Sequence, residues 1–143
     1  MRKAIKITIV LAMLAVPSAA LAASTSGPQA INCSQLKTKP TRITLSCGDA
    51  GTWLGKLKWS TWNKTQAVAN GNFSANNCTP DCAAGKTHSV AVTVTLSKVK
   101  NCPGQGQVSP AFKHATITYK STRPKGAPLS VNFRCPPGLP GAY

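Results

Sequence analysis

Apolar and polar residues alternate with a period of two along several parts of the chain, a pattern typical of β-strands that bury one face. The clearest example covers residues 88–99, where Val90, Val92, Val94 and Leu96 share one face and small or hydroxyl-bearing residues share the other. No segment beyond residue 22 repeats apolar residues at helical spacing over three turns. The pattern therefore predicts strands and no helix in this part of the chain.

Five shorter segments carry the same alternation, and turn residues separate them. They are residues 43–47, 57–62, 66–74, 115–119 and 129–135. In the second segment, Leu57 and Trp59 share one face and Trp62 lies opposite. In the third, small residues such as Gly71 leave room for another element to pack closely. In the last, Leu129 is expected to point inward, together with every second residue after it.

Strands of this length with frequent turns predict an all-β domain over residues 31–135. We expect an antiparallel two-sheet sandwich, Ig-like in general architecture and stapled by disulfides. A small barrel is the alternative. The length suits one domain. Residues 23–30 are small and polar and are interpreted as a flexible leader, and residues 136–143 are interpreted as a flexible tail.

The first 22 residues have the pattern of a signal peptide. Arg2, Lys3 and Lys6 form a charged start, residues 7–16 an apolar run, and Ala20-Leu21-Ala22 a small-residue cleavage site. No later apolar run is long enough to span a membrane. We therefore expect a secreted, extracellular protein without a transmembrane segment after cleavage, and association with the cell surface is a further expectation.

The six cysteines are even in number and stand in a chain expected to be exported, which favours disulfides. Six cysteines allow 15 pairings in principle. We favour pairs of near neighbours, with the third pair following by elimination. The favoured pairs are Cys33 with Cys47, Cys78 with Cys82, and Cys102 with Cys135. A metal site formed by Cys78, Cys82 and His88 is the alternative, but its spacing does not suit zinc, and no metal or cofactor is expected.

The chain is strongly basic, and this bears on its function. The chain has 17 basic side chains against two acidic ones, and the part beyond residue 22 keeps 14 basic side chains and a net charge of +12. Because glutamate is absent, paired-carboxylate hydrolysis would rest on Asp49 and Asp81 alone. The excess favours salt-sensitive attachment to a polyanion, such as an anionic polymer of the cell envelope. A cationic surface that only keeps a monomer soluble is the simpler alternative.

Aromatic residues offer a more specific candidate site. Trp53 and Trp62 could form a platform for stacking against a sugar, with Lys56 and Lys58 beside them, if both indoles are exposed. Trp59 is assigned to the core. Specific recognition of nucleic acid is not expected, because eleven lysines outnumber three arginines beyond residue 22 and no aromatic stacking series accompanies them.

No catalytic residue is expected. A triad would need His88 or His114, yet neither histidine lies in a motif and no Gly-x-Ser-x-Gly elbow occurs. Asp49 and Asp81 both stand in turn-forming sequences, where a short carboxylate accepts hydrogen bonds from nearby backbone.

Two motifs, Trp59-Ser60-Thr61-Trp62 and the Asn-Cys-x-Pro-x-Cys-Ala-x-Gly segment of residues 77–85, carry a resemblance. Over roughly residues 40–96 the chain resembles small uncharacterised secreted proteins of actinobacteria. The resemblance implies export, small size and a disulfide-stapled domain, and implies no activity.

We therefore interpret the chain as a small cationic secreted protein, monomeric and non-enzymatic. Its expected role is that of a cell-envelope or extracellular binding or structural module, whose partner is an anionic envelope polymer or an extracellular protein. The alternative is a proteinaceous protease inhibitor that presents the loop between Cys78 and Cys82, or else Lys100-Asn101-Cys102 or Arg123-Pro124-Lys125.

Overall fold

The computed structural model describes residues 27–103 and 108–136, and within these ranges the chain forms eight strands and no helix. The all-β prediction is confirmed. The strands are β1 (Gln29–Asn32), β2 (Gln35–Lys37), β3 (Ile43–Thr44), β4 (Thr52–Trp62), β5 (Ala67–Asn76), β6 (Thr87–Pro103), β7 (Val108–Tyr119) and β8 (Ser130–Asn132). The expected signal peptide lies outside the described residues. β1 begins two residues before the expected domain boundary, within the expected leader.

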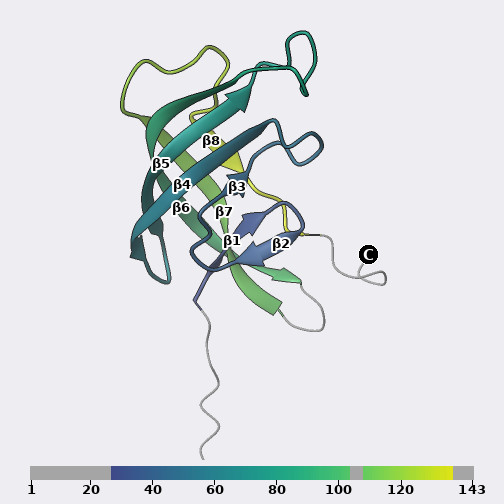
Figure 1. Ribbon diagram of the computed structural model, residues 1–143. Helices are drawn as coiled ribbons and strands as arrows, with labels where there is room; N and C mark the ends of the chain where they lie inside the picture. Colours follow the sequence, from purple (N-terminus) through teal and green to yellow (C-terminus); the bar gives the residue numbers. More distant parts are fainter. Residues whose placement is uncertain (1–26, 104–107, 137–143) are drawn as a thin grey trace, which may run out of the picture.

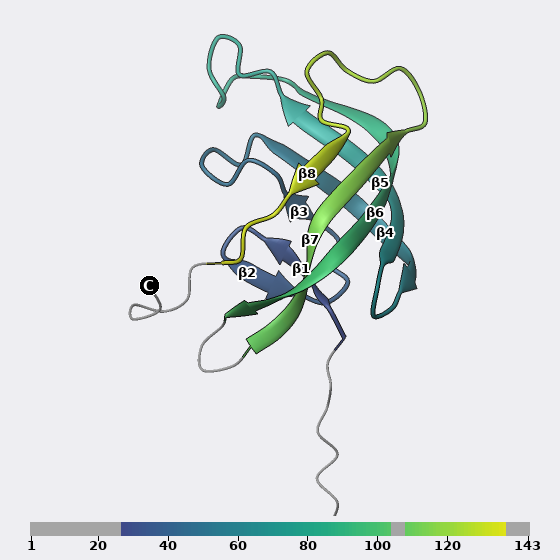
Figure 2. The ribbon, with the colours of Figure 1, turned by 180° about the vertical axis from the view of Figure 1, so that it is seen from behind.

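All eight strands belong to one sheet, in the order β2-β1-β7-β6-β5-β4-β3, with β8 pairing to β7 as well. β4, β5, β6 and β7 form an antiparallel meander, whereas β1 pairs parallel to β7. The sheet is therefore mixed and curls into a half-barrel, with β4 and β5 on one side of the interior and β7 and β8 on the other (Figures 1 and 2). These pairings do not give the expected antiparallel two-sheet, Ig-like sandwich.

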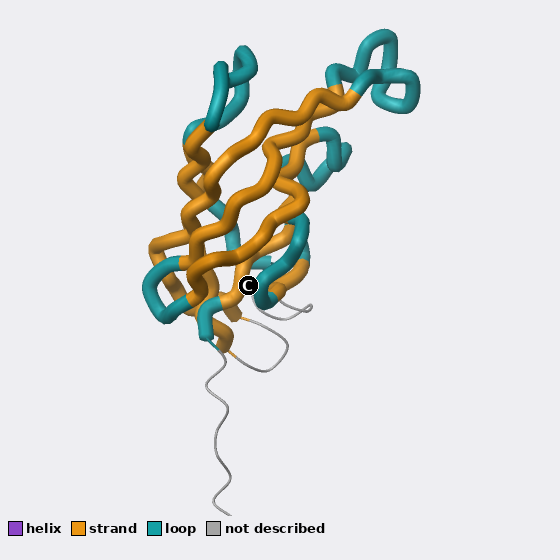
Figure 3. The backbone as a smooth tube through the Cα atoms, turned by 60° about the vertical axis from the view of Figure 1, so that its left-hand side comes forward, coloured by secondary structure: helices purple, strands orange, loops and turns teal. Residues whose placement is uncertain are grey.

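Irregularities in the long strands let one sheet surround the core. β4 shifts its register against β5 between Gly55 and Lys58 and again between Trp59 and Thr61. Such bulges bend a strand and increase its twist. Lys56 in β4 and Lys98 in β6 also have positive φ angles of 52° and 56°. Figure 3 shows the resulting strands side by side in one curled layer.

The two ends of the sheet approach each other along a line that we call the seam. There the Asn32 side-chain oxygen accepts a hydrogen bond from the Thr44 backbone N–H at 2.9 Å. The disulfide between Cys33 and Cys47 joins the same two ends covalently. A side chain and a disulfide thus connect β1 to β3 where no strand pairing does so in the described part of the chain.

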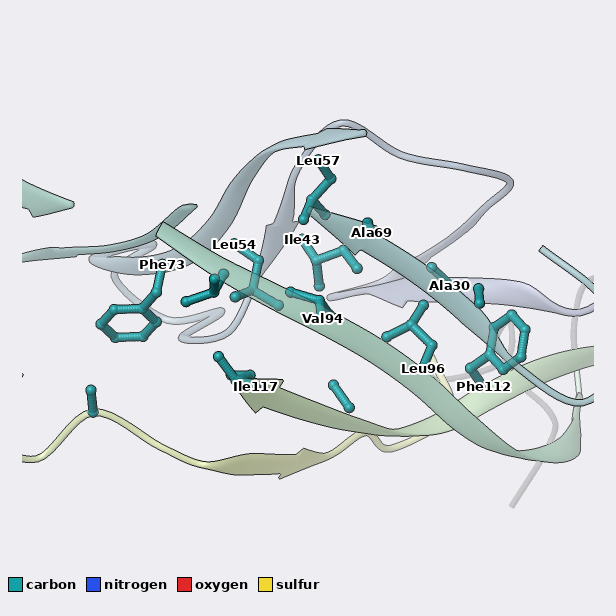
Figure 4. Packing of buried hydrophobic residues seen from close by; sticks show 14 residues of the cluster. Ala30, Ile43, Leu54, Leu57, Ala69, Phe73, Val94, Leu96, Phe112 and Ile117 are labelled. Atoms are coloured by element: carbon teal, nitrogen blue, oxygen red, sulfur yellow. The ribbon is translucent and has the colours of Figure 1, made fainter. Parts of the chain in front are cut away.

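The core fills the concave side of the sheet. Val92, Val94 and Leu96 are fully buried, as their alternation predicts, and Val90 is partly buried. Figure 4 shows how Val94 lies among side chains that belong to other strands. The largest fully buried side chains are Phe112, Ile43, Leu54, Leu96 and Ile117. Leu129 is 58% exposed, so its predicted inward orientation is wrong; it lies just before β8, at the end of that short strand.

The three disulfides have the pairing that the sequence favoured. Cys33 bonds to Cys47, Cys78 to Cys82 and Cys102 to Cys135, and no free cysteine remains in the described residues. Cys102 is fully buried in a small second cluster with Ile31 and Ala111. Since a thin core leaves a small domain marginal, covalent links of this kind contribute strongly to its stability.

Gly71 shows where β4 and β5 pack most tightly. A Cβ atom at this position would lie 2.6 Å from the Gly55 carbonyl oxygen and 2.8 Å from Leu57 Cδ2. We predict that Gly71→Ala lowers the free energy of unfolding by about 1–3 kcal/mol, because the backbone of β4 would have to shift. Urea denaturation of the oxidised protein measures this change.

Gly48→Ala is the matched control. A Cβ atom at Gly48 has no neighbour within 4 Å, so the lost flexibility of the unfolded chain should leave stability unchanged or raise it by about 0.4–1 kcal/mol. Equal effects of the two substitutions would contradict the close approach of β4 to Gly71.

Candidate binding groove

A groove of about 430 Å³ lies on the outer face of the sheet over β4, β5 and β6, and we call it the Trp53 groove. Trp53 pairs across the strands with Ser74, which in turn pairs with Ser89. The neighbouring row contains the core residues Leu54 and Phe73, so the Trp53 row points to the opposite, outer face. The residues that line the groove are Thr41, Arg42, Trp53, Gly55, Lys56, Asn72, Ser74 and Ser89.

The Trp53 indole lies between a cation and a glycine. The Arg42 guanidinium carbon is 4.2 Å from the centre of the ring, a cation–π arrangement. A Cβ atom at Gly55 would be only 3.1 Å from Trp53 Cδ1 and Nε1. Gly55 therefore allows the indole to lie close against β4, and Arg42 holds it there.

The indole N–H of Trp53 is available to a ligand. Trp59 Nε1 donates to the Pro40 carbonyl at 2.8 Å and Trp62 Nε1 to the Pro28 carbonyl at 3.0 Å. Among the described residues Trp53 Nε1 has no such acceptor, and the side chain is only partly buried. Because indole nitrogens usually find a partner when buried, the free N–H identifies Trp53 as the tryptophan that faces outward.

Hydroxyl and amide groups form the floor of the groove. The Ser74 and Ser89 hydroxyl oxygens are 2.7 Å apart and share a hydrogen bond. Ser74 is 4% exposed, the only buried polar side chain in the described part of the chain. Asn72 is partly buried beside them. These groups can donate to or accept from the hydroxyls of a ligand.

The rim of the groove is positively charged. Arg42 and Lys56 both line it, and no acidic side chain does. Lys56 lies in the bulge of β4 with its positive φ angle, and strained backbone of this kind is frequent at functional sites. The combination of cations, one aromatic ring and hydroxyl groups suits a ligand that carries both negative charge and hydroxyl groups.

The predicted site residues do not all come together. Trp53 and Lys56 share the groove, but Lys58 and Trp62 are not among the residues that line it. Lys58 is exposed beyond the first register shift of β4. The prediction that Trp62 lies opposite Trp59 is wrong, because the second register shift turns it toward the core, where the two rings meet edge to face at 4.7 Å.

Five polar or charged residues of the groove were absent from the predicted site. They are Thr41, Arg42, Asn72, Ser74 and Ser89. Asn72 and Ser74 stand two residues apart in a strand whose intervening residue, Phe73, is buried. The alternation therefore places them on the outer face, but only strand pairing brings them beside Trp53.

The two aspartates are engaged in turns, as their sequence context predicts. Asp49 accepts a hydrogen bond from the Gly51 N–H at 2.9 Å, and this bond, with one from the Ser46 side chain, lowers the pKa of the Asp49 carboxyl. Asp81 accepts from the N–H groups of Ala83 and Ala84.

The two histidines lie elsewhere on the sheet. His88 is exposed, and His114 Nδ1 is 3.5 Å from the Ser97 hydroxyl. No group of three or more His, Cys, Asp or Glu side chains within residues 27–103 and 108–136 is arranged to hold a metal ion.

The loop between Cys78 and Cys82 is compact and mostly exposed. The side chains of Asn76, Asn77 and Asp81 accept hydrogen bonds from backbone N–H groups in or next to this loop. Asn76 also donates to the Cys82 carbonyl. The loop is therefore folded on itself, whereas the inhibitor alternative requires an extended segment that a protease can bind.

Comparison with protein-family models, with curated proteins and with solved structures gave no match. Within the described residues, no helix has the length and apolar character needed to cross a membrane.

Proposed function

We propose that this domain is a non-enzymatic binding module for anionic, hydroxyl-rich polymers of the cell envelope or extracellular space. The observation that supports the proposal best is the Trp53 groove, in which Arg42 and Lys56 flank an indole with a free N–H above a floor of hydroxyl groups. A secreted protein would meet such polymers outside the cell, and three disulfides are compatible with an oxidising environment.

Each part of the groove has a separate role in this proposal. Arg42 offers a planar set of donors that can bind a phosphate or carboxylate group through two hydrogen bonds. Lys56 adds a second positive charge at the rim. Trp53 supplies an apolar surface and one N–H donor, and Ser74, Ser89 and Asn72 supply partners for hydroxyl groups.

The basic side chains outside the groove attract the polymer to the domain as a whole. With 14 basic side chains against two aspartates beyond residue 22, the domain attracts polyanions from any direction, and this attraction weakens as salt screens it. The same charge opposes self-association, which supports a monomer. Specificity then rests on the groove, and general attraction on the dispersed lysines.

We predict that Trp53→Ala weakens binding to isolated teichoic acid by about tenfold or more at physiological salt, because the apolar contact and the N–H donor are both lost. Trp53→Phe, which keeps a ring but loses the N–H, should have a smaller effect. Calorimetric titration of the oxidised domain measures both changes, with heparin and DNA as comparison polymers.

Lys56→Ala and Lys64→Ala form a matched pair for the charge contribution. Each removes one exposed lysine, but only Lys56 lines the groove. Lys56→Ala should weaken binding several-fold more than Lys64→Ala. If both variants lose the same affinity, and if teichoic acid, heparin and DNA all dissociate at the same salt concentration, the groove is not the binding site and the charge acts only in bulk.

A further inference from the structure

A second groove, of about 570 Å³, lies along the seam, and we call it the seam groove. It is separate from the Trp53 groove and has no lining residue in common with it. The segments that contribute to it are those around β1, β3 and β8. Its lining residues are Ile31, Cys33, Ser34, Thr44, Leu45, Cys47, Val131, Asn132, Phe133, Arg134 and Cys135.

The edge of β8 that faces away from β7 has no strand partner in the described part of the chain. Two backbone hydrogen bonds join Leu129 and Phe133 to β7. The Ile117 N–H donates to the Leu129 carbonyl, and the Phe133 N–H donates to the Lys113 carbonyl, both at 2.8 Å. Since backbone groups alternate in direction along an antiparallel strand, those of Ser130 and Asn132 point to the free edge. Asn132 itself lines the seam groove.

The edge of β3 is free in a similar way. β3 pairs only with β4 among the described strands. Its outward N–H, that of Thr44, is taken by the Asn32 side chain rather than by a strand. The seam therefore presents hydrogen-bonding groups that strand pairing leaves unused, mainly along β8.

The seam groove has an apolar interior and a positive end. Leu45, Val131 and Phe133 are partly buried and pack against the main core. At the Cys135 end, Arg134 is exposed and the Lys113 ammonium nitrogen lies 3.2 Å from Cys135 Sγ. No acidic side chain lines the groove.

We propose that the seam groove binds an extended acidic peptide segment of a partner protein, which adds to β8 as an antiparallel strand. Strand addition uses free backbone groups for affinity and alternating side chains for specificity. The inner side chains of the added strand contact Leu45 and Phe133, and its outer side chains lie beside Arg134. A peptide in which apolar and acidic residues alternate therefore matches the apolar interior of the groove with one face and Arg134 with the other.

Charge and backbone chemistry favour this occupant over the others. A second copy of the chain would bring a further net charge of +12 to a positive surface, and the two copies would repel each other. A small amphiphile would fill the apolar interior but would leave the backbone groups of Ser130 and Asn132 unused. This inference does not depend on the proposed function of the Trp53 groove.

The test uses a peptide with the sequence Glu-Val-Glu-Val-Glu-Val-Glu, acetylated and amidated at its ends, and the oxidised domain labelled with ¹⁵N. We expect chemical-shift changes confined to β8, β3 and the seam, and about tenfold slower hydrogen exchange at the Asn132 amide when the peptide is bound. Replacing all Glu residues of the peptide with Lys should abolish binding.

Two peptide controls separate strand addition from apolar contact. In the proposed register the Glu residues lie opposite Ser130 and Asn132 and form the backbone bonds to β8. N-methylation of the Glu residues should therefore abolish binding, whereas N-methylation of the Val residues should preserve it. Equal binding of both methylated peptides would overturn the proposal in favour of an apolar ligand.

Substitutions in β8 test the same backbone bonds from the protein's side. Asn132→Pro removes the outward N–H without removing a bond to β7, and it should weaken peptide binding about tenfold relative to Asn132→Ala. The proposal is also overturned if peptide binding drives dimer formation. A variant that ends at Pro136 tests whether residues 137–143 of the chain itself compete with the peptide for the groove. If this variant binds the peptide much more tightly than the full chain does, the groove is assigned to those residues instead.

Discussion

Removal of the disulfide between Cys102 and Cys135 is expected to lower the free energy of unfolding by about 4 kcal/mol, the largest effect of any of the three disulfides. The cross-link spans 33 residues, against 14 for Cys33–Cys47 and 4 for Cys78–Cys82. A longer closed loop removes more conformational freedom from the unfolded chain. Small domains have a total stability of about 5–15 kcal/mol, so the loss would leave the fold marginal.

The local surroundings of this disulfide add to the effect. Cys102 is fully buried beside Ile31 and Ala111, so its replacement also disturbs packing at the end of β6. Cys135 follows β8 and ties the end of that short strand back to β6. The seam groove should therefore be lost together with the disulfide, whereas the Trp53 groove, built on β4, β5 and β6, should be affected less.

The comparison is between two double variants, Cys102→Ala with Cys135→Ala, and Cys78→Ala with Cys82→Ala. The second removes a partly exposed cross-link over a short loop and should cost about 2 kcal/mol. Urea denaturation monitored by tryptophan fluorescence gives both values. If the two variants lose the same stability, closure of the long loop is not what stabilises the fold.

Much of the fold follows from local patterns in the sequence. The alternation of Val92, Val94 and Leu96 is strong because β6 has one face in the core and one in solvent. Turn residues around Asp49 and Asp81 form the hydrogen bonds that their chemistry predicts. The disulfide pairing also followed, since two of the pairs are near neighbours in sequence.

The arrangement of the sheet did not follow, because it depends on contacts between distant segments. The parallel pairing of β1 with β7 joins Ala30 to Phe112 across more than half of the chain. Nothing in the alternation of either strand specifies a partner or a direction. Whether strands form one curled sheet or two stacked sheets is decided by such pairings and by bulges, which leave little trace in a binary pattern.

The same reason limits prediction of the site. Trp53 and Lys56 could be selected because they are a large aromatic and a cation three residues apart in one strand. Arg42 precedes β3 and reaches Trp53 only through the pairing of β3 with β4. Trp62 was misplaced because β4 shifts its register between Trp59 and Thr61, and a shift of one residue reverses the face of every side chain after it.

Phe112 shows how a residue outside the recognised strand patterns can organise the fold. It is fully buried, pairs with Ala30 of β1 and Val99 of β6, and meets the Trp62 ring edge to face at 5.5 Å. Trp62 in turn donates to the Pro28 carbonyl just before β1. One aromatic side chain thus links the parallel strand, the meander and the tryptophan pair.

We predict that Phe112→Ala lowers the free energy of unfolding by about 3–5 kcal/mol, through lost burial and the cavity that remains. Phe112→Leu should cost less, because it refills much of the space. Val108→Ala, at a 65% exposed position of the same strand, is the control and should change stability by less than about 0.5 kcal/mol. Because Trp62 loses its aromatic neighbour, Phe112→Ala should also shift tryptophan emission in the folded protein, a change that Val108→Ala should not produce.

A Phe112→Ala protein as stable as the Val108→Ala control would mean that β1 is not held against β7 by this contact. The parallel end of the sheet would then have to be stabilised by the Cys33–Cys47 disulfide and the Asn32–Thr44 hydrogen bond at the seam.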